Sequence, residues 1–291
     1  MSILDAVIQA IIQGLTEFLP VSSSGHLSLF QHFTGQSGEG ALLFSAILHL
    51  GTLVAVFIAF RETIWALIKE FFVMLKDIFT GKFKWSTMNG ERRMIIMLVI
   101  SLAMLIPFYI FKDFFTGIAE DSDILVEGVC FLYTSLILYL SDRQVKKHYK
   151  EPKDITVKDA VVVGAFQGVA LLPGVSRSGS TIAGGLFSGF SRELAIRYSF
   201  ILGIPAILGG CLLEIKDAFE TGFELEVVPF VVGFIVAGVV GICAIKMVSW
   251  LMKSDKFKIF AYYTLALGIV VTAIGIFEKI VGMNFVDYIK M

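Results

Sequence analysis

Charged side chains are scarce in this sequence. Asp, Glu, Lys and Arg make up 17% of the 291 residues, whereas about 25% is usual for a soluble domain. Hydrophobic residues make up 56%, and the mean hydropathy is +0.82. This composition excludes a soluble globular protein, because such a chain would aggregate unless a bilayer solvated it. The net charge of −1 gives no general attraction to nucleic acid, so no nucleic-acid partner is expected.

Cysteine is also rare, and its placement excludes two further classes of protein. The three cysteines fall inside apolar runs, with neither the spacing of a zinc site nor that of a disulfide framework: Cys130, Cys211 and Cys243. The N-terminus has no basic region, since Asp5 is the only charge before Glu17, so no cleavable signal peptide is expected. Long apolar stretches continue to the C-terminus, which predicts an integral membrane protein.

Long apolar runs are abundant and predict an all-α fold. A helix needs roughly 20 mostly apolar residues to cross a bilayer. Six segments meet this condition and are predicted to be full spans: 41–60, 94–111, 124–141, 194–213, 228–247 and 259–277. Two further apolar segments, 3–33 and 158–190, are each interrupted by a proline and a Ser/Gly cluster. Their halves are too short to cross, so each is predicted to be a re-entrant helical hairpin whose bend lies within protein or faces water.

Lysine and arginine gather in three connecting segments, which predicts the orientation of the spans. Short loops rich in these residues stay on the cytoplasmic side. The basic segments are 61–93, 142–158 and 246–258, and the acidic ones are 112–123 and 214–226. The basic segments are therefore predicted to lie inside, and the acidic segments and both termini outside. The first hairpin then opens outside and the second inside, with three spans after each, as in an inverted-topology repeat.

The two predicted hairpins also match in sequence. Identical residues recur at one constant offset: Asp5-Ala6-Val7 with Asp159-Ala160-Val161, Gln13-Gly14 with Gln167-Gly168, Val21-Ser22 with Val175-Ser176, and Ser24-Gly25 with Ser178-Gly179. Chance is unlikely to give so many identities around the same pattern. We therefore predict a single membrane domain over 1–291, with a first repeat at 1–141 and an inverted second repeat at 158–291.

The differences between the hairpins point to one shared site. Three matched positions differ in kind: Glu17 against Leu171, Ser23 against Arg177, and His26 against Ser180. The acid and the imidazole are thus in one half and the guanidinium is in the other. A purely structural duplication gives no reason for this division, whereas one site at the interface of the two hairpins does.

Polar residues of the first half-helix form a single stripe. Asp5, Gln9, Gln13 and Glu17 recur every four residues on an otherwise apolar helix. At membrane depth such a stripe must face protein or water. Hydrogen bonding to a neighbouring helix is sufficient to explain Asp5 and Gln9. An unpaired carboxylate at Glu17 would be costly, so Glu17 is predicted to be functional.

Both Ser/Gly clusters are predicted to bind an anion. Serines at a break before a helix are N-cap residues, and capping alone would explain Ser22 or Ser24. A helix N-terminus with free N–H groups is also an anion site. The second cluster adds Arg177, whose planar guanidinium can bind phosphate oxygens bidentately. The predicted substrate-binding residues are Gln13, Ser22, Ser24, Gly25, Ser176, Ser178, Gly179 and Thr181.

The ionisable residues suggest hydrolysis of a phosphoanhydride or phosphoester on a lipid. His26 can move protons near neutral pH, Glu17 can hold a divalent metal or act as a base, and a serine can be a nucleophile if a base activates it. The predicted catalytic residues are Glu17, Ser23, His26 and Arg177, with Glu17 also the candidate metal ligand. The nucleophile stays open between Ser23, His26 and a metal-bound water, and a structural ion pair between Glu17 and Arg177 is the alternative. A structural role is favoured for His49, which lies inside a span.

Two motifs resemble one family of membrane enzymes. The stretch 13–27, QGLTEFLPVSSSGHL, closely resembles the undecaprenyl-diphosphate phosphatase family, known for bacitracin resistance. PGVSRSG at 173–179 resembles that family's second motif, and the resemblance extends over essentially the whole chain. Gln13 and Glu17 fill the family's acidic motif, (Glu/Gln)-x-x-x-Glu, in its Gln form.

The resemblance implies an activity and a setting. It implies hydrolysis of undecaprenyl diphosphate to the monophosphate carrier for peptidoglycan synthesis, at the outer face of the bacterial plasma membrane. It also implies dependence on a divalent cation, Mg²⁺ or Ca²⁺. By the match, the functional positions are Glu17, Ser23, His26 and Arg177. The expected partners are a polyprenyl diphosphate lipid and the membrane, and the oligomeric state stays open, a homodimer included.

Three other classes compete with this interpretation. A lipid transporter or flippase is the main alternative, because inverted repeats and broken helices are the architecture of alternating access. The phosphatidic-acid phosphatase type 2 superfamily also uses a Ser-Gly-His element. It needs a histidine at a fixed distance after its Ser-Arg, and the stretch after Arg177 has none. A structural scaffold is disfavoured by ionisable residues predicted to be buried.

Overall fold

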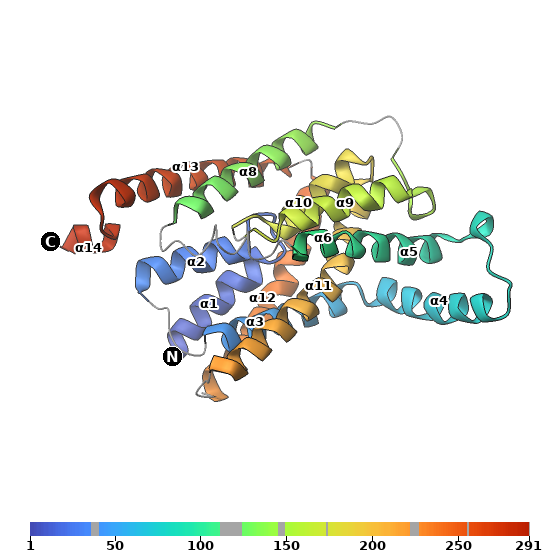
Figure 1. Ribbon diagram of the computed structural model, residues 1–291, viewed down its shortest axis with the longest axis horizontal. Coiled ribbons are helices and arrows are strands. Elements are labelled where there is room, and N and C mark those ends of the chain that lie inside the picture. Colours follow the sequence, from blue (N-terminus) through green and yellow to red (C-terminus); the bar gives the residue numbers. More distant parts are fainter. Residues whose placement is uncertain are drawn as a thin grey trace.

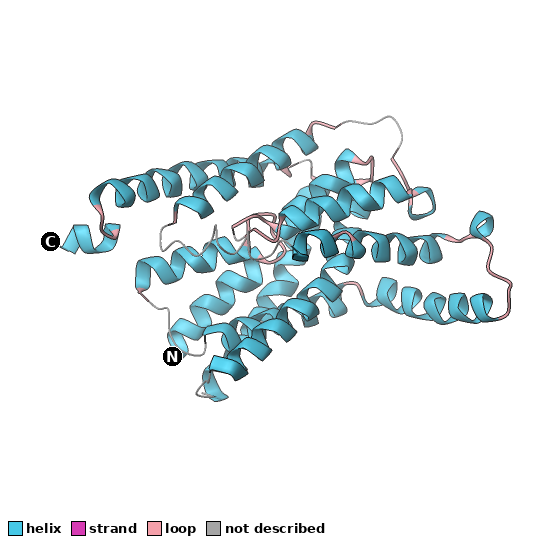
Figure 2. Ribbon diagram, in the orientation of Figure 1, coloured by secondary structure: helices cyan, strands magenta, loops and turns pink. Residues whose placement is uncertain are grey.

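The computed structural model describes residues 1–35, 41–110, 124–144, 149–172, 174–221, 227–254 and 256–290. The regular structure of these residues is helical, apart from one isolated β-bridge between Lys150 and Phe190 (Figure 2). The helices are α1 (Ile3–Thr16), α2 (Ser23–Thr34), α3 (Ala41–Ala59), α4 (Arg61–Phe79), α5 (Gly90–Ala103), α6 (Leu105–Ile110), α8 (Leu125–Asp142), α9 (Val157–Val169), α10 (Arg177–Phe187), α11 (Arg192–Thr221), α12 (Val227–Lys253), α13 (Lys258–Val281) and α14 (Phe285–Lys290). Two 3₁₀ turns, η1 (Trp85–Thr87) and η2 (Pro152–Asp154), lie in the connections.

The long helices make this a multi-pass membrane protein. Five helical segments are long and apolar enough to cross a bilayer: Gly90–Ile110, Leu125–Asp142, Arg192–Glu220, Val227–Lys253 and Lys258–Val281. A sixth is available if α3 and α4, which meet at 83°, are counted as one bent span. Five of the predicted spans lie on these five segments, and the predicted span 41–60 lies on α3. The long apolar runs therefore located the spanning helices.

Each predicted hairpin consists of two short helices separated by a break. Pro20 lies in the first break, where its missing N–H and fixed backbone oppose helix continuation. The second helix of each pair begins with a serine cap. The Gly25 N–H donates to Ser22 Oγ at 3.2 Å, and the Gly179 N–H donates to Ser176 Oγ at 3.0 Å. The Ser/Gly clusters thus start α2 and α10, whereas Pro173 lies outside the described residues.

One helix was not predicted. Residues 61–93 are predicted from their charges to be a basic connecting segment, but the structure forms the 19-residue helix α4 within it. Lysines interleave with its apolar residues, so no long uncharged run marks it. Ile64 and Leu67 are buried, while Trp65, Phe72 and Phe79 are exposed. The amphipathic spacing of these residues, rather than their mean hydropathy, was the signal for this helix.

The two halves of the chain exchange packing partners. In each half the first short helix packs against the second spanning helix of the other half, since α1 contacts α12 and α9 contacts α5. The last spanning helices, α8 and α13, lie side by side (Figure 1). A Cβ added at Gly14 would lie 2.8 Å from the Ala237 carbonyl oxygen, so α1 approaches α12 more closely than a larger residue permits. The broken helices are therefore held between spans from both halves.

The basic segments meet at one end of the molecule, which we call the basic end. Arg93 Nη1 donates to the Lys153 carbonyl oxygen at 3.0 Å, which joins α5 to η2. Arg192 at the start of α11 donates to Met252 O at 2.9 Å and to Asp142 Oδ1 at 2.8 Å, which joins it to the ends of α12 and α8. Both termini lie on the left of Figure 1, away from the α4–α5 connection at the far right. The acidic segment 112–123 lies outside the described residues, as do parts of 142–158 and 214–226.

Candidate active site

The two helix breaks lie against each other in the interior of the protein. The Gly174 N–H donates to Ser24 Oγ at 3.3 Å, and Ser178 Oγ donates to the Leu19 carbonyl oxygen at 3.1 Å. A Cβ added at Gly25 would lie 3.2 Å from Gly174 Cα, so the two backbones approach closely here. The structure therefore brings the two Ser/Gly clusters together.

A carboxylate and a guanidinium join the two hairpins. Glu17 directly follows α1, is 7% exposed, and pairs through Oε1 with Arg177 Nη2 of α10. Its other oxygen, Oε2, accepts from Ser23 Oγ at 2.8 Å and from Gln13 Nε2 at 3.1 Å. Gly203 of α11 faces the guanidinium, and a Cβ there would collide with it. Because a buried charge is stable only when it is paired, Glu17 and Arg177 hold each other in place.

A histidine from α3 reaches the same carboxylate from another side. His49 Nε2 lies 3.8 Å from Glu17 Oε2, and its Nδ1 lies 3.9 Å from Glu214 Oε2 on α11. His49 Nδ1 also bonds the Ser45 carbonyl oxygen at 3.0 Å. A carbonyl oxygen can only accept a hydrogen bond, so we assign a proton to His49 Nδ1. The other ring nitrogen, Nε2, faces Glu17. Sequence reasoning favoured a structural role for His49 and did not single out Glu214.

These residues surround a cavity of about 210 Å³. Both breaks contribute serines, and α3 and α11 close the far wall. The polar lining consists of Thr16, Glu17, Ser22, Ser23, Ser24, His49, Ser176, Arg177, Ser178 and Glu214. Spacing along α3 could have pointed to His49, because Ser45 and His49 lie one helical turn apart on the same face of an apolar span.

His26, by contrast, is not part of this lining. Its Nδ1 donates to the Ser22 carbonyl oxygen at 2.7 Å, and its Nε2 accepts from the Tyr263 hydroxyl at 2.8 Å. The ring stacks on Tyr263 and meets Phe131 edge-on. The hydroxyl of Ser23, one of the candidate nucleophiles, donates to Glu17 rather than to His26. His26 thus holds the backbone of the turn that presents Ser23.

That turn is strained. Ser22 has a φ of 73°, the single positive value among non-glycine residues in the described ranges. Holding such a residue in a sparsely populated conformation costs on the order of 1–3 kcal/mol. Three contacts oppose the strain: the capping bond from Gly25, the His26 bond to the Ser22 carbonyl, and a 3.3 Å contact between the Ser22 and Ser24 hydroxyls. The conformation orients the next residue, Ser23, toward Glu17.

The remaining predicted binding residues support the cavity from behind. Thr181 Oγ1 donates to the Arg177 carbonyl oxygen at 2.9 Å and lies 2.6 Å from Ser199 Oγ, so it steadies the first turn of α10. Gln13 orients Glu17, and the Gly179 N–H is used in capping. The cavity is therefore faced by the Arg177 guanidinium, serine hydroxyls and the N-terminal ends of α2 and α10, together with His49 and the carboxylates of Glu17 and Glu214. Helix N-termini and guanidinium groups both favour phosphate oxygens.

Two carboxylates that could face a metal ion, Glu17 and Glu214, line the site. Among the residues that the structure describes, no group of three or more His, Cys, Asp and Glu side chains could hold a metal ion. Both oxygens of Glu17 already bond Arg177, Ser23 and Gln13. Mg²⁺ is commonly held by one or two carboxylates together with substrate phosphates. The residues therefore fit a cation that arrives with a diphosphate rather than a site formed by protein alone.

The fold and the site define a class: a multi-pass helical membrane protein with a polar cavity, lined by serines, an arginine and carboxylates, between two pairs of short helices. The chain belongs to the bacitracin resistance protein BacA family, whose model matches residues 6–270. It is 39% identical over 274 residues to the undecaprenyl-diphosphatase of Alkaliphilus metalliredigens, covering 93% of this chain and 98% of that protein. The undecaprenyl-diphosphatase of Carboxydothermus hydrogenoformans is 40% identical over 274 residues, covering 93% and 97%, and that of Halothermothrix orenii is 38% identical over 279 residues, covering 95% and 100%.

Proposed function

We propose that this protein hydrolyses undecaprenyl diphosphate to undecaprenyl phosphate and inorganic phosphate. Recycling of this lipid carrier serves peptidoglycan synthesis, and it is the basis of bacitracin resistance. Nearly full-length similarity to proteins named undecaprenyl-diphosphatase supports the assignment. The structural observation that carries it is one carboxylate, Glu17, with the Ser23 hydroxyl on one oxygen and Arg177 on the other.

This arrangement supports a serine as the nucleophile. Glu17 is within 2.8 Å of the Ser23 hydroxyl and is positioned to take its proton. Ser23 Oγ then bonds the terminal phosphorus while the bond from that phosphorus to the bridging oxygen breaks, and the lipid leaves as a monophosphate. Water next attacks the phosphoserine and releases inorganic phosphate, and the proton held by Glu17 returns to Ser23 Oγ. Arg177 and the N-termini of α2 and α10 stabilise the charge on the phosphoryl oxygens.

A divalent cation, Mg²⁺ or Ca²⁺, belongs to the proposal as a companion of the substrate. Glu17 is the residue that would hold it, and the cation would neutralise charge on the diphosphate. Arg177 and the serines bind and orient the phosphates in either case.

We further propose that the cavity opens to the outer face of the bacterial plasma membrane. The meeting of the basic segments at the basic end supports one orientation, with that end in the cytoplasm. The exchange of packing partners between α1 and α12 and between α9 and α5 supports two hairpins in an inverted-topology repeat. Single cysteines at Leu4 and Lys82, in a background with the native cysteines replaced, should label only from outside and only from inside, respectively. The opposite labelling would overturn the orientation.

A phosphate-release assay tests the activity. Purified full-length protein should release phosphate from undecaprenyl diphosphate, and a chelator should abolish the release until Mg²⁺ or Ca²⁺ is restored. Lipid bound or moved between leaflets without phosphate release would support a transporter instead. Phosphate release that is unaffected by a chelator would support the phosphatase activity but contradict the requirement for a divalent cation.

A further inference from the structure

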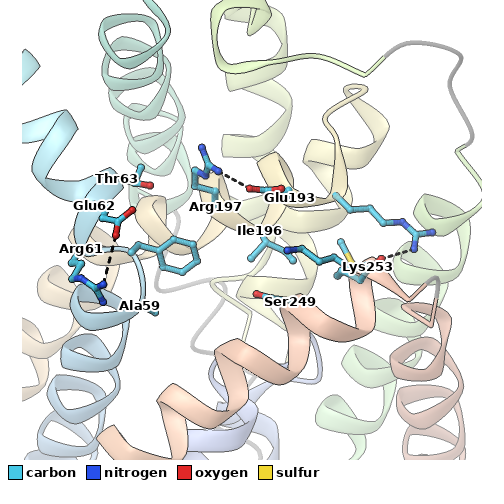
Figure 3. Close-up of a pocket in the computed structure, with 12 residues that line it drawn as sticks. Ala59, Arg61, Glu62, Thr63, Glu193, Ile196, Arg197, Ser249 and Lys253 are labelled. Carbon is cyan, nitrogen blue, oxygen red and sulfur yellow. Dashed lines mark hydrogen bonds and ion pairs between the residues drawn. The ribbon is translucent and has the colours of Figure 1, made fainter.

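A second cavity lies at the basic end, away from the candidate active site. It measures about 300 Å³ and forms where the α3–α4 bend, the first turns of α11 and the last turn of α12 meet (Figure 3). Four cationic residues and two carboxylates line it: Arg61, Arg192, Arg197, Lys253, Glu62 and Glu193. The cavity therefore has an excess of positive charge.

Arg192 is neutralised by Asp142 at 2.8 Å, whereas the other three cations of this cavity are weakly neutralised. Arg61 pairs with Glu62 at 3.6 Å and Arg197 pairs with Glu193 at 2.7 Å. Three of these four side chains are largely exposed, and exposed pairs contribute little stability, so an anion can compete for the cations. Lys253 has no ion pair within the described parts of the chain, and its side chain extends toward the middle of the cavity in Figure 3.

An apolar groove lies beside this cavity. It measures about 430 Å³, and every side chain that lines it on α4, α5 and α11 is apolar. The two spaces adjoin along two helices. On α4, Thr63 lines the cavity and Ile64 lines the groove, and on α11 Arg197 lines the cavity and Ile201, one turn further along, lines the groove. A charged space thus lies next to an apolar one along both helices, an arrangement that matches an amphiphile.

The second cavity is distinct from the candidate active site. Arg197 on α11 is separated from Ala206, the first residue of that helix after it to line the active cavity, by roughly 14 Å of helix at 1.5 Å per residue. The two cavities share the helices α3 and α11 but no lining residue.

We propose that the cavity and the groove together bind one anionic phospholipid of the surrounding leaflet. Its phosphate headgroup lies among Arg61, Arg197 and Lys253, and an acyl chain lies in the groove beside α4. Cations at the edge of a bilayer attract lipid phosphates, and basic pockets between spanning helices bind such headgroups. The groove supplies the apolar surface that a free phosphate ion could not use. The lipid then bridges the α3–α4 bend and the start of α11.

The lipid content of the purified full-length protein tests this assignment. Native mass spectrometry from micelles with equal amounts of dioleoyl phosphatidylglycerol and dioleoyl phosphatidylcholine should show at least about a fivefold preference for the anionic lipid. The triple variant Arg61→Gln, Arg197→Gln, Lys253→Gln should bind both lipids equally. Lys82→Gln, Lys84→Gln, Lys158→Gln is the matched control, because it removes the same charge from the basic end outside the cavity and should keep the preference.

Three outcomes would overturn the proposal. Equal loss of preference in both triple variants would reduce the effect to general charge. If short-chain dihexanoyl phosphatidylglycerol binds equally well, the groove does not contribute to lipid binding. If an equal concentration of inorganic phosphate displaces the lipid, the cavity binds a free anion rather than a lipid. Thermal unfolding and phosphate release of both variants show whether the fold and the active cavity are intact. A failure of the lipid-binding proposal can therefore be distinguished from a failure of the proposed phosphatase activity.

Discussion

The two hairpins share one backbone plan and differ in what their side chains do. Both begin their second helix with a serine cap, and each has a glutamine at the same place in its first helix. In the first hairpin Gln13 donates to Glu17, whereas in the second neither side-chain polar atom of Gln167 has a partner in the described structure. Leu171 stands where the first hairpin has Glu17, and buried Ser180 stands where it has His26. Both hairpins therefore have a serine-capped helix N-terminus, and only the first adds the acid and the imidazole.

The same division continues into the spans that follow. At the offset that relates the hairpins, Ser45, Leu48 and His49 on α3 match Ser199, Leu202 and Gly203 on α11. His49 approaches the carboxylate that binds the small residue Ser23, while Gly203 leaves room for the large residue Arg177. In the first half the small side chain is on the hairpin and the large one is on the span that follows. In the second half the large side chain is on the hairpin and the span has the small residue. Specialisation of the repeat therefore involves four elements rather than two.

The largest effect is expected when Glu17 of the first hairpin is replaced by leucine, the residue at the matched position 171 of the second hairpin. Glu17→Leu leaves Arg177 buried without its counter-ion, and removing one partner of a buried pair costs about 3–5 kcal/mol. Turnover should fall at least about a thousandfold, because the base and the orienting group are lost together. Phosphate release and thermal unfolding measure the two losses. Leu171→Ala at the matched position is the control and should change turnover less than about threefold, since it removes only apolar contact. Comparable losses in both variants would contradict the asymmetry between the hairpins.

Ser23→Ala should abolish turnover while leaving lipid binding and the fold intact. Loss of the attacking oxygen should lower the rate at least about a thousandfold. Ser22→Ala and Ser24→Ala should cost much less, since a cap contributes about 1 kcal/mol. Phosphate release and binding of the diphosphate lipid separate the two effects.

Trapping sharpens this prediction, because water could fill the place of a missing serine. The enzyme is mixed with lipid labelled in its terminal phosphate and quenched within one turnover. Acid-stable label on Ser23 is expected. Acid-labile label on His26 would make the histidine the nucleophile, and absence of label would favour direct attack by water.

Much of this arrangement was accessible from the sequence, and the exceptions have physical causes. The apolar runs located the spanning helices, and the Ser/Gly clusters located the caps. Helix α4 was missed because its lysines interrupt every apolar run, although its apolar residues follow helical spacing. The contact of His49 with Glu17 was missed because it depends on how α3 packs beside the hairpins. The direction of the His26 side chain depends likewise on Tyr263, far away in sequence.

Arg177→Lys tests the guanidinium that the second hairpin contributes. Lysine keeps the charge but offers a point charge in place of a planar fork. Loss of such a group from a phosphoryl site should lower kcat/KM by about a hundredfold. Kinetics of phosphate release on the purified variant measure the change. Turnover close to that of the wild type would reduce the contribution of Arg177 to general electrostatics.

Gly203→Ala tests the balance of volumes between α11 and the second hairpin. The added methyl group collides with the guanidinium, which must shift away from Glu17. A displacement of this size at a positioning group should lower kcat by about tenfold. Gly209→Ala is the matched control, because a Cβ there meets no atom within 4 Å. An equal effect in both variants would point to helix flexibility rather than to crowding of Arg177.

The smallest effect is expected at the contact that holds His26. Tyr263→Phe removes one hydroxyl and keeps the ring that stacks on the imidazole. The hydrogen bond to His26 Nε2 contributes about 1 kcal/mol, which corresponds to about a fivefold change in rate if it is needed to hold the turn. The loss should fall on kcat rather than KM, because the turn orients Ser23 and His26 does not line the cavity. Tyr262→Phe, on the adjacent exposed tyrosine, removes the same group and should leave both constants unchanged. A change in KM alone would instead mean that Tyr263 or His26 contacts the lipid directly. If kcat falls, single-turnover labelling of Ser23 should slow by the same factor, since the strained Ser22 turn would then present its nucleophile less often.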